Sequence, residues 1–504
     1  MPMKFRTLPA TDDLPRALYT SEQVRGFDRL AIEEFAIPGL ELMERAGRAA
    51  FDLLRRRWPQ ASSVAVLAGT GNNAGDGFVV ARLAREAGLG VTVLQLGDRE
   101  RLRGDAAVNA ARWQEAGGDW RPFTGIPQAV DLIIDALLGT GLDRAVTGYW
   151  AEAIAAINAH PAPCLAVDIP SGLDADSGVV LGDAVRAAAT ISFIGLKPGL
   201  FTADGPDNVG EVVFDSLGVP ATVYASSLLS ARRIDWRKQG ALLGPRRRNV
   251  HKGHFGHVLV IGGNHGMGGA PRLAAEAALR VGAGLVSLAT RPEHLAPVLA
   301  MRPEVMVHAT DDPAALLPLL RAATVIAIGP GLGRDAWARA LWDAACGAAR
   351  PLVVDADALH LLAEAPVRRD DWVLTPHPGE AAALLAVCSA EIQGQRLQSA
   401  RDLQHRFGGS VVLKGAGSVV ASTGSTPPAI CSDGNPGMAS GGMGDALTGV
   451  IAGLLAQGFG VRDAAEAGVC LHAAAGDVAA DMGGERGLLA GDLINCLRGL
   501  VNPR

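Results

Sequence analysis

Residues 62–84 read SSVAVLAGTGNNAGDGFVVARLA and contain the pattern that decides the fold. The stretch Ser63–Ala68 is short and apolar and is followed by Gly69, which is typical of a buried strand. A helical pattern begins at Phe78, after a glycine-rich loop. Glycines let a backbone approach a phosphate closely, and a helix N-terminus offers free N–H donors and a partial positive charge. The stretch therefore predicts a strand, a nucleotide-type binding loop and a helix.

The same pattern recurs along the chain, where short apolar runs alternate with Ala-rich helical segments. This spacing predicts parallel strands joined by crossover helices. Ser21 is a candidate cap for a helix through Ile32, a second helix is expected at 40–58, and the chain from Met443 onward is expected to be helical. The further strand candidates are Val91–Leu96, Asp131–Asp135, Cys164–Asp168, Ala188–Ile194, His257–Ile261, Leu285–Ala289, Thr324–Ile328, Pro351–Asp355, Trp372–Thr375 and Ser410–Leu413.

A chain of 504 residues is long enough for more than one domain. The alternation of strand and helix patterns becomes less regular near residues 216–250, where Ser, Arg and Pro accumulate. We expect an α/β protein with a doubly wound, Rossmann-like domain at 1–225, a linker at 226–240 and a second doubly wound domain at 241–504.

The composition is globular, with 49% apolar and 19% charged residues. A net charge of −6 argues against nucleic acid or an anionic membrane surface as a partner. The six cysteines include no C-x-x-C pair, so neither a zinc ribbon nor a disulfide framework is predicted. The N-terminal residues have no apolar core of a signal peptide, and no apolar run reaches membrane-spanning length. We therefore expect a cytoplasmic protein that acts on small molecules.

Two aspartates stand at further strand ends of the first domain. Asp135 opens DALLGTGL and Asp168 opens DIPSGLD. In an open parallel sheet these ends face one crevice. Oxygen atoms from Asn73, Asp135 and Ser171 suit an alkali or alkaline-earth ion rather than zinc, which leaves Asp168 as a general acid or base. The alternative is that each aspartate merely caps the helix after it.

The segments GNNAGDG, DALLGTGL, DIPSGLDADSG and FIGLKPGL together resemble the YjeF N-terminal domain, the NAD(P)H-hydrate epimerase, across about residues 20–220. The resemblance implies that Asp168 is catalytic and that a potassium ion is held by Asn73, Asp135 and Ser171. Ala74 replaces a glycine that is often found in this family. The substrate-binding residues that the resemblance implies are Asn72, Asn73, Ala74, Gly75, Asp76, Gly139, Thr140, Gly141 and Leu142.

The second domain has glycine-rich segments at five strand ends: GGNHGMGGA at 262–270, GPGLG at 329–333, TPHPGE at 375–380, KGAGS at 414–418 and NPGMASGGMGDALTG at 435–449. In the last segment a flexible turn presents backbone donors for an anion beside Asp445. Such an aspartate can deprotonate a hydroxyl that then attacks a phosphoryl group. The alternative is an ordinary helix entry with an N-terminal aspartate. No G-x-x-x-x-G-K-[ST] occurs, so a P-loop enzyme is excluded.

The GGMGD motif is similar to that of ribokinase-fold small-molecule kinases. With KGHFGHVLVIGG and VVDADAL, the full set resembles the YjeF C-terminal domain, the ADP-dependent NAD(P)H-hydrate dehydratase, over 240–500. The resemblance implies a ribokinase-like domain with Asp445 as the base, and ADP with Mg²⁺ as the phosphoryl donor. It also assigns Ala270, Gly331 and His377 to the hydrate, and Lys414, Gly415, Ala416, Gly417, Ser418 and Gly444 to the nucleotide.

These resemblances imply a bifunctional enzyme that repairs hydrated nicotinamide cofactors. It would interconvert the R and S hydrates and dehydrate the S form while ADP becomes AMP and phosphate. We expect small-molecule substrates and a homo-oligomer. One rival is a ribokinase-fold small-molecule (vitamin-type) kinase with an accessory nucleotide-binding domain, which would release a stable phosphorylated product. A second rival is a non-catalytic nucleotide-binding scaffold, which loss of Asp168 and Asp445 would have suggested; both are present.

Overall fold

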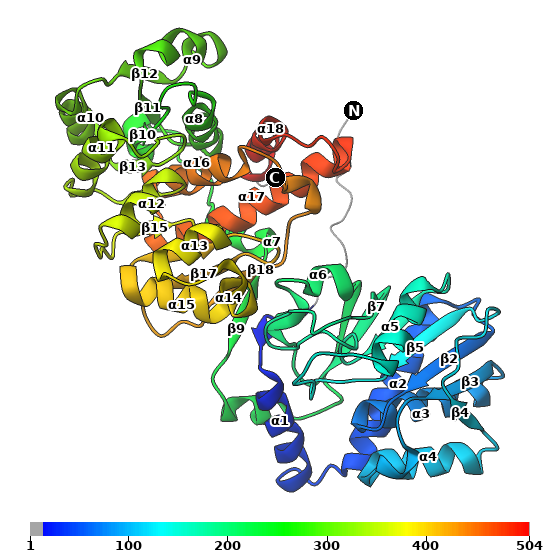
Figure 1. The fold of residues 1–504 in the computed structure, drawn as a ribbon. Coiled ribbons are helices and arrows are strands. Elements are labelled where there is room, and N and C mark those ends of the chain that lie inside the picture. The colour runs from blue at the N-terminus through cyan, green and yellow to red at the C-terminus, as the bar shows by residue number, and fades with distance from the viewer. Residues whose placement is uncertain (1–13, 503–504) are drawn as a thin grey trace. The chain divides into compact units, whose positions relative to one another are not determined.

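The computed structural model describes residues 14–502. Contacts divide the chain into two compact units, with the division between Arg232 and Arg233 (Figure 1). The division falls within the expected linker 226–240, and this segment contains regular structure: strand β9 (Ala231–Ile234) and helix α7 (Trp236–Gln239). Residues 1–13, for which the sequence predicts no targeting segment, and residues 503–504 lie outside the described part of the chain.

The N-terminal unit alternates strands and helices as the sequence predicts. Its strands are β1 (Ala17–Leu18), β2 (Ser63–Ala68), β3 (Gly90–Gln95), β4 (Trp120–Pro122), β5 (Leu132–Ala136), β6 (Cys164–Val167), β7 (Ala189–Phe193) and β8 (Glu211–Asp215). Its helices are α1 (Ser21–Glu33), α2 (Gly39–Arg57), α3 (Asn72–Glu86), α4 (Gly104–Glu115), α5 (Tyr149–Ala159) and α6 (Gly205–Asn208).

The sheet of this unit has seven strands in the order β4-β3-β2-β5-β6-β7-β8, and all of its neighbouring strands are parallel. Successive residues of β2 point to opposite faces, as strand geometry requires. Val64 and Val66 pack into one core with α2, α3 and α4, while Ala65 and Leu67 pack into the other with α5. Helices on both faces make this a doubly wound sheet.

The C-terminal unit is also an α/β unit. Its strands after β9 are β10 (His257–Ile261), β11 (Leu285–Thr290), β12 (Met306–Ala309), β13 (Val325–Ile328), β14 (Leu352–Val354), β15 (Trp372–Leu374), β16 (Ser410–Leu413), β17 (Val419–Ser422) and β18 (Ala429–Cys431). Its helices after α7 are α8 (Gly269–Val281), α9 (Leu295–Met301), α10 (Leu317–Ala322), α11 (Ala336–Cys346), α12 (Asp357–Glu364), α13 (Pro378–Leu385), α14 (Ser389–Gly394), α15 (Arg396–Phe407), α16 (Met443–Ala456), α17 (Val461–Gly483) and α18 (Ala490–Leu500).

The strands of this unit follow the order β9-β18-β17-β16-β15-β14-β13-β10-β11-β12. The pairs from β12 to β16 are parallel, whereas β16, β17 and β18 form antiparallel pairs. One core joins the central strands to α8, α16, α17 and α18, through Val258, Ala274, Val450, Leu471 and Ile494. The long apolar pattern after Met443 thus becomes helices that cover the sheet.

The α/β fold is confirmed, and the observed strands β2, β10 and β16 have the predicted bounds. The sequence did not reveal the strands β1, β4, β8, β9, β12, β17 and β18. Two local predictions are wrong. Helix α3 begins at Asn72 rather than Phe78, so residues 72–77 of the glycine-rich segment form its first turns after the cap Gly71. The cap of α1 is Thr20 rather than Ser21. The Thr20 hydroxyl accepts a hydrogen bond from the Gln23 N–H, and the Gln23 side chain accepts one from the Thr20 N–H.

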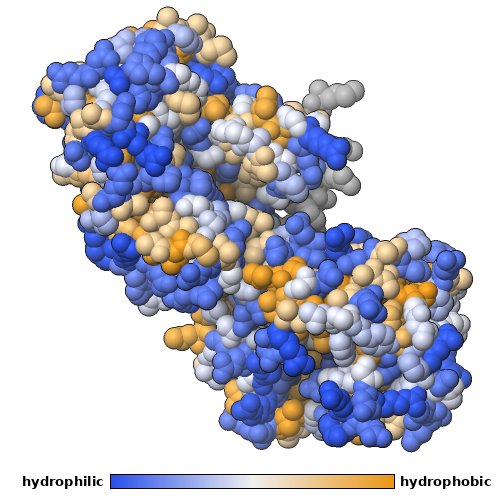
Figure 2. Space-filling model, in the orientation of Figure 1, coloured by the Kyte–Doolittle hydropathy of each residue, from blue (hydrophilic) through white to orange (hydrophobic). Residues whose placement is uncertain are grey.

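Within residues 14–502 no helix combines the length and the apolar character that a bilayer crossing needs. On the face drawn in Figure 2, hydrophilic residues surround smaller groups of hydrophobic ones. All six cysteines are free thiols.

Candidate active sites

The predicted residues of the first site lie at the carboxyl ends of three adjacent strands. The glycine-rich loop follows β2, Asp135 lies in β5, and Asp168 directly follows β6. Because β2, β5 and β6 are neighbours in a parallel sheet, these ends meet at one edge. The structure therefore brings together the motifs that the sequence places far apart.

The three proposed potassium ligands are linked by hydrogen bonds. The Ser171 hydroxyl lies 2.6 Å from an Asp135 carboxylate oxygen and accepts a hydrogen bond from the Leu138 N–H. The Asn73 amide nitrogen donates to the Leu138 carbonyl over 3.1 Å. Among the described residues, the buried Asn73 Oδ1 has no hydrogen-bond partner. An unpartnered buried oxygen is costly, so a cation bound here would satisfy it.

Asp135 is fully buried, and burial raises the pKa of its carboxyl to about 6 despite the opposing hydrogen bonds from Ser171. No positively charged side chain is among the causes of this shift. A bound cation would favour the carboxylate form, as a nearby opposite charge does. The donor set of amide, hydroxyl and carboxylate oxygens therefore fits a hard cation.

Asp168 is paired with a lysine that the sequence did not assign to the site. Its carboxylate accepts a hydrogen bond from the ammonium of Lys197, whose side chain is 0% exposed. Lys197 also donates to the Ser192 hydroxyl over 3.1 Å. Asp168 has a φ of +66°, a left-handed conformation that is uncommon outside glycine. Such strained residues cluster at functional sites. Lys197 lies in the segment FIGLKPGL, which was the available sequence signal.

Helix α1 also faces this site. The Ser21 N–H donates to Asp176 over 2.7 Å, and the Arg25 guanidinium donates to the Thr140 carbonyl over 3.2 Å. Asp28, on the same helix, interacts electrostatically with Asp168 and Lys197. Burial and then the charge of Asp168 raise the pKa of Asp28 to about 6. The sequence did not identify Asp28, because its helix precedes every glycine-rich loop.

The predicted substrate loops adjoin one another. Asn72 is exposed at the first turn of α3, whose cap Gly71 offers no side-chain hydrogen bond. A methyl group at Gly139 would lie 3.4 Å from the Asn73 side chain, so the 139–142 loop packs beside that helix start. Ala74 and Gly75 are buried, and a methyl group at Gly75 would meet Met43 of α2 and Ala106 of α4. Burial and the charges of Asp168 and Asp28 raise the pKa of Asp76. The free N–H groups at this helix start suit a phosphate.

In the C-terminal unit, the segments after β10 and β13 meet. Gly331 has a φ of +57°, and a methyl group there would lie 2.8 Å from the Met267 carbonyl and 3.4 Å from Ala270 Cβ. Glycine is thus required by conformation and by space. The Asn264 N–H donates to the Gly331 carbonyl over 2.7 Å. The structure therefore brings together Ala270 and Gly331, the predicted hydrate-binding residues.

Lys414 lies in a buried network of charges. Its ammonium is 2.7 Å from Asp355 Oδ1 and 3.7 Å from Glu380 Oε2. Thr448 donates to Asp355 Oδ2 over 2.8 Å. Burial opposes the charge on Lys414, but the Asp355 and Glu380 carboxylates outweigh it and raise the pKa of Lys414. Asp355 and Glu380 were not predicted as site residues, although Asp355 lies in the motif VVDADAL and Glu380 in the motif TPHPGE.

Asp445 lies in the first turn of α16, after Gly442. Burial and then the charge of Asp355 raise the pKa of Asp445 to about 6, against the opposing effect of Lys414. A methyl group at Gly444 would lie 3.3 Å from Lys414 Nζ. The Gly-rich turn, the lysine and the aspartate therefore share one site, where a carboxylate with a pKa near neutral can act as a base.

The 414–418 loop joins β16 to β17, and a buried arginine holds it. Arg396 is 1% exposed, and its guanidinium donates to the carbonyls of Leu413, Lys414 and Gly417 over 3.3–3.5 Å. Ser418 closes the loop with a hydrogen bond to the Gly415 carbonyl of 3.0 Å. Gly415 and Ala416 are exposed at the tip, where they can meet a ligand. Arg396 carried no motif and was not predicted.

His377 forms hydrogen bonds at the start of helix α13. Its ring accepts hydrogen bonds from the Gly379 and Glu380 N–H groups, and it caps α13. Its side chain remains 55% exposed, and its Nε2 lies 3.4 Å from the buried Glu380 Oε1. Of the other histidines, His251 and His254 stack with ring centroids 3.7 Å apart, while His257 bonds to Ser287. The three do not converge on one point.

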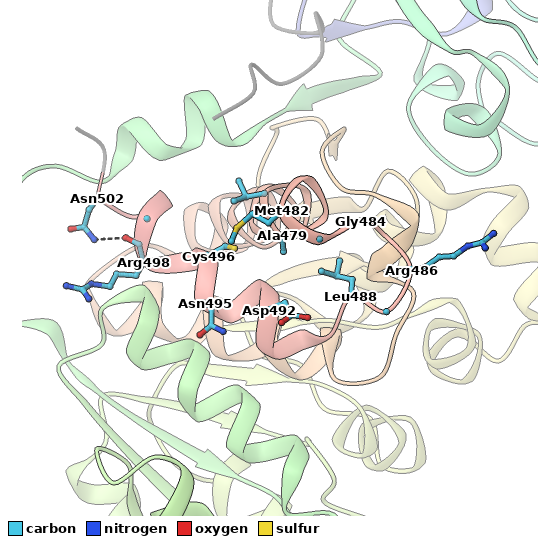
Figure 3. A pocket seen from close by; sticks show the side chains of 14 residues that line it. Ala479, Met482, Gly484, Arg486, Leu488, Asp492, Asn495, Cys496, Arg498 and Asn502 are labelled. Carbon is cyan, nitrogen blue, oxygen red and sulfur yellow. Dashed lines mark hydrogen bonds between the residues drawn. The ribbon is translucent and has the colours of Figure 1, made fainter. Parts of the chain in front are cut away.

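A separate cavity of about 840 Å³ lies between the end of α17 and α18. Figure 3 shows Met482, Leu488, Asp492 and Cys496 around it. The cavity contains none of the predicted site residues, although Ser440 in the Gly-rich turn donates to the Leu488 carbonyl over 2.9 Å.

Comparison with known proteins gives consistent matches. A family model described as NAD(P)H-hydrate dehydratase matches residues 258–498, and one described as YjeF-related protein N-terminus matches residues 39–199. The bifunctional NAD(P)H-hydrate repair enzyme Nnr of Coxiella burnetii is 50% identical, covering 96% of this chain and 99% of that protein. The protein of that name from Escherichia coli is 46% identical, covering 97% of this chain and 95% of its own. A solved structure of a ribokinase-like superfamily protein from Enterococcus faecalis is 30% identical, covers 55% of this chain and 96% of its own, and has a TM-score of 0.51.

Proposed function

The chain belongs to the family of bifunctional NAD(P)H-hydrate repair enzymes, and from this premise we propose which residues carry each of its two activities. The N-terminal unit is the epimerase, and the C-terminal unit is the dehydratase. The observation that carries the proposal is that each unit gathers its motif residues at the carboxyl ends of its own strands, and that these residues include a buried carboxyl whose pKa is raised to about 6, Asp135 in the first unit and Asp445 in the second.

In the epimerase unit the start of α3 and the 139–142 loop bind the nucleotide of the hydrate, through Asn72, Asn73, Ala74, Gly75, Asp76, Gly139, Thr140, Gly141 and Leu142. Potassium would be held by Asn73, Asp135 and Ser171, and it would supply positive charge beside the bound anion. The unpartnered Asn73 oxygen supports this site. Asp168 acts at the reacting ring, and Lys197 fixes its carboxylate.

In the dehydratase unit the reaction begins at the hydroxyl on C6 of the hydrate. Hydroxide is a poor leaving group, so the oxygen is first phosphorylated. Asp445 takes the hydroxyl proton, the oxygen attacks the terminal phosphorus of ADP, and the bond to AMP breaks. Phosphate then leaves C6 as a proton leaves C5, which restores the double bond. Ala270, Gly331 and His377 would bind the hydrate, and Lys414, Gly415, Ala416, Gly417, Ser418 and Gly444 the nucleotide.

Mg²⁺ would accompany ADP and neutralise its phosphates. The nearby Asp355 accepts hydrogen bonds on both oxygens, from Lys414 and Thr448, which hold its carboxylate in place. The phosphate oxygens themselves would hold the ion. Lys414 lies beside Gly444 and would meet the same phosphates.

The test follows the recovery of NADPH absorbance from a prepared mixture of R and S hydrates with ADP and Mg²⁺. We expect complete recovery, with one AMP and one phosphate formed per hydrate repaired. If repair instead proceeds with ATP and yields ADP, while ADP alone is inert, the assignment of ADP as phosphoryl donor is wrong. The assignment of the dehydratase activity would still stand. A stable phosphorylated product would instead support a kinase.

A further inference from the structure

Helix α1 presents three polar residues to the epimerase site. Ser21, Arg25 and Asp28 follow one another at intervals of four and three, which places them on one face of a helix. The apolar residues Val24, Phe27 and Ala31 occupy the neighbouring face and are buried. Ser21 and Arg25 reach the loops after β6 and β5 through the hydrogen bonds to Asp176 and Thr140. The face that carries Asp28 is thus fixed against the ends of the sheet.

The packing around Asp28 keeps α1 in this position. Phe27 makes an edge contact with Tyr224, with centroids 5.3 Å apart, and the Tyr224 hydroxyl donates to the Ile194 carbonyl over 2.7 Å. Tyr19 and Val24 lie against Gly195, two residues before Lys197. These contacts tie α1 to the segment that carries the lysine partner of Asp168.

The charged and titratable groups that face Asp28 come from four different segments: Asp76 of α3, Asp168 after β6, Lys197 after β7, and Tyr224. Lys197 is committed to Asp168 by a hydrogen bond and ion pair. Asp28 is half-buried and has no ion pair of its own among the described residues. The site therefore combines one carboxylate held by a lysine with a second one that is free to carry a proton.

We propose that Asp28 is a second catalytic carboxylate of the epimerase site, the general acid that gives its proton to the hydroxyl on C6 of the bound hydrate. The inference rests on the proposed epimerase function of this unit. Inversion at C6 requires that a bond to this carbon break and form again, and proton donors and acceptors on the reacting oxygen lower that barrier.

Asp28 protonates the hydroxyl, the C6–O bond breaks, water leaves, and the electron pair of the ring nitrogen forms a C=N bond. Water then adds to the opposite face of C6, the C=N electrons return to nitrogen, and the Asp168 carboxylate takes the proton of the incoming water. Transfer of this proton from Asp168 to Asp28 restores the starting enzyme. No oxidant, reductant or further reactant is consumed.

The test compares Asp28→Asn with Glu33→Gln, an exposed carboxylate on the same helix. With mixed hydrates and ADP, the S hydrate is consumed in a fast phase that reports the dehydratase, and the R hydrate follows at the rate of epimerisation. We expect Asp28→Asn to lower kcat of the second phase at least about a hundredfold, with KM nearly unchanged and the fast phase intact. Glu33→Gln should match the wild type.

The pH profile separates catalysis from structure. Since the acid must be protonated, wild-type epimerase kcat/KM should fall as pH rises through about 6. Asp28→Glu should retain part of the activity and move this limb to higher pH, because glutamate has the higher intrinsic pKa. An Asp28→Asn variant with wild-type kcat, or an Asp28→Glu profile that does not move, would overturn the proposal. If the wild-type protein does not epimerise the hydrates at all, the proposed epimerase function of this unit is wrong. That result is distinct from a failure of the Asp28 proposal, because it is obtained without any variant.

Discussion

In each site one carboxylate is paired with a buried lysine, and a second carboxyl group has no lysine of its own. Lys197 holds Asp168 in the first unit, and Lys414 holds Asp355 in the second. Asp28 and Asp445 are among the carboxyls without such a lysine, and both have a pKa raised to about 6. Burial disfavours charge and a neighbouring carboxylate adds to this, so a group without a cation of its own becomes suited to proton transfer.

For Asp445 the direction of the pH dependence follows from its proposed role as a base. Because only the ionised carboxylate can take a proton, dehydratase kcat/KM should rise as pH increases through about 6. Asp445→Asn should lower kcat about a hundredfold to ten-thousandfold. Initial rates with pure S hydrate at saturating ADP check both, with exposed Asp481→Asn as the control. A flat profile between pH 5 and 8 would count against the assignment.

Asn73 offers a test of potassium at a single atom. Wild-type epimerase activity should drop when potassium is exchanged for a large organic cation and return when potassium is added. Asn73→Ala removes the unpartnered oxygen, so it should weaken the potassium response at least several-fold. The measurement is the R-hydrate rate across a potassium titration. Activity that survives exhaustive exchange in the wild type would refute the site.

At the scale of elements, the sequence predicts the strands that are buried and apolar, together with the glycine-rich loops that follow them. It does not predict β12, whose residues are half-buried or exposed, or the short antiparallel β17 and β18. The motif residues could be placed because the ends of parallel strands converge. Asp28 and Arg396 could not, because the packing of α1 and α15 brings them to their sites and no local pattern records that packing. Lys197 lies in the quoted segment FIGLKPGL, but its pairing with Asp168 depends on how the segment after β7 packs beside β6.

Arg396 of α15 is expected to position the nucleotide loop without touching the ligand. Arg396→Met leaves the carbonyls of Leu413, Lys414 and Gly417 without their donor, so the 414–418 loop should loosen. We expect KM for ADP to rise about tenfold or more, while kcat at saturating ADP changes much less. Steady-state kinetics over an ADP series check this, with exposed Arg406→Met on the same helix as the control. An unchanged KM in a folded variant would contradict the assignment.

At the scale of the whole molecule, the proposed assignment gives each unit its own catalytic and binding groups. The two activities should therefore be separable by single substitutions. Asp445→Asn should epimerise hydrates without restoring NADPH, and Asp168→Asn should repair the S hydrate and let the R hydrate accumulate. Asparagine tolerates the left-handed backbone at residue 168, so this variant tests the carboxylate itself.

Mixing the two variants tests whether the hydrate must stay on one molecule. If each site works independently, an equimolar mixture of Asp168→Asn and Asp445→Asn should repair both hydrates completely, because substrate released by one chain reaches the other. Absorbance recovery and the residual R hydrate are measured together. A mixture that repairs only the S hydrate would show that the R hydrate has to be processed within one chain.

The Asp168–Lys197 pair also links catalysis to the lifetime of the protein in the cell. A chain that loses this carboxylate keeps a lysine that is 0% exposed and has lost its counter-ion, and breaking a buried pair in this way costs about 3–5 kcal/mol. Loss of stability on that scale raises the unfolded fraction that chaperones and proteases remove. Degradation would destroy the intact dehydratase unit together with the damaged one. A lesion that leaves dehydration untouched in the test tube would then abolish both activities in vivo through falling abundance, and replacing Lys197 by methionine in the same chain would restore the protein level but not epimerisation.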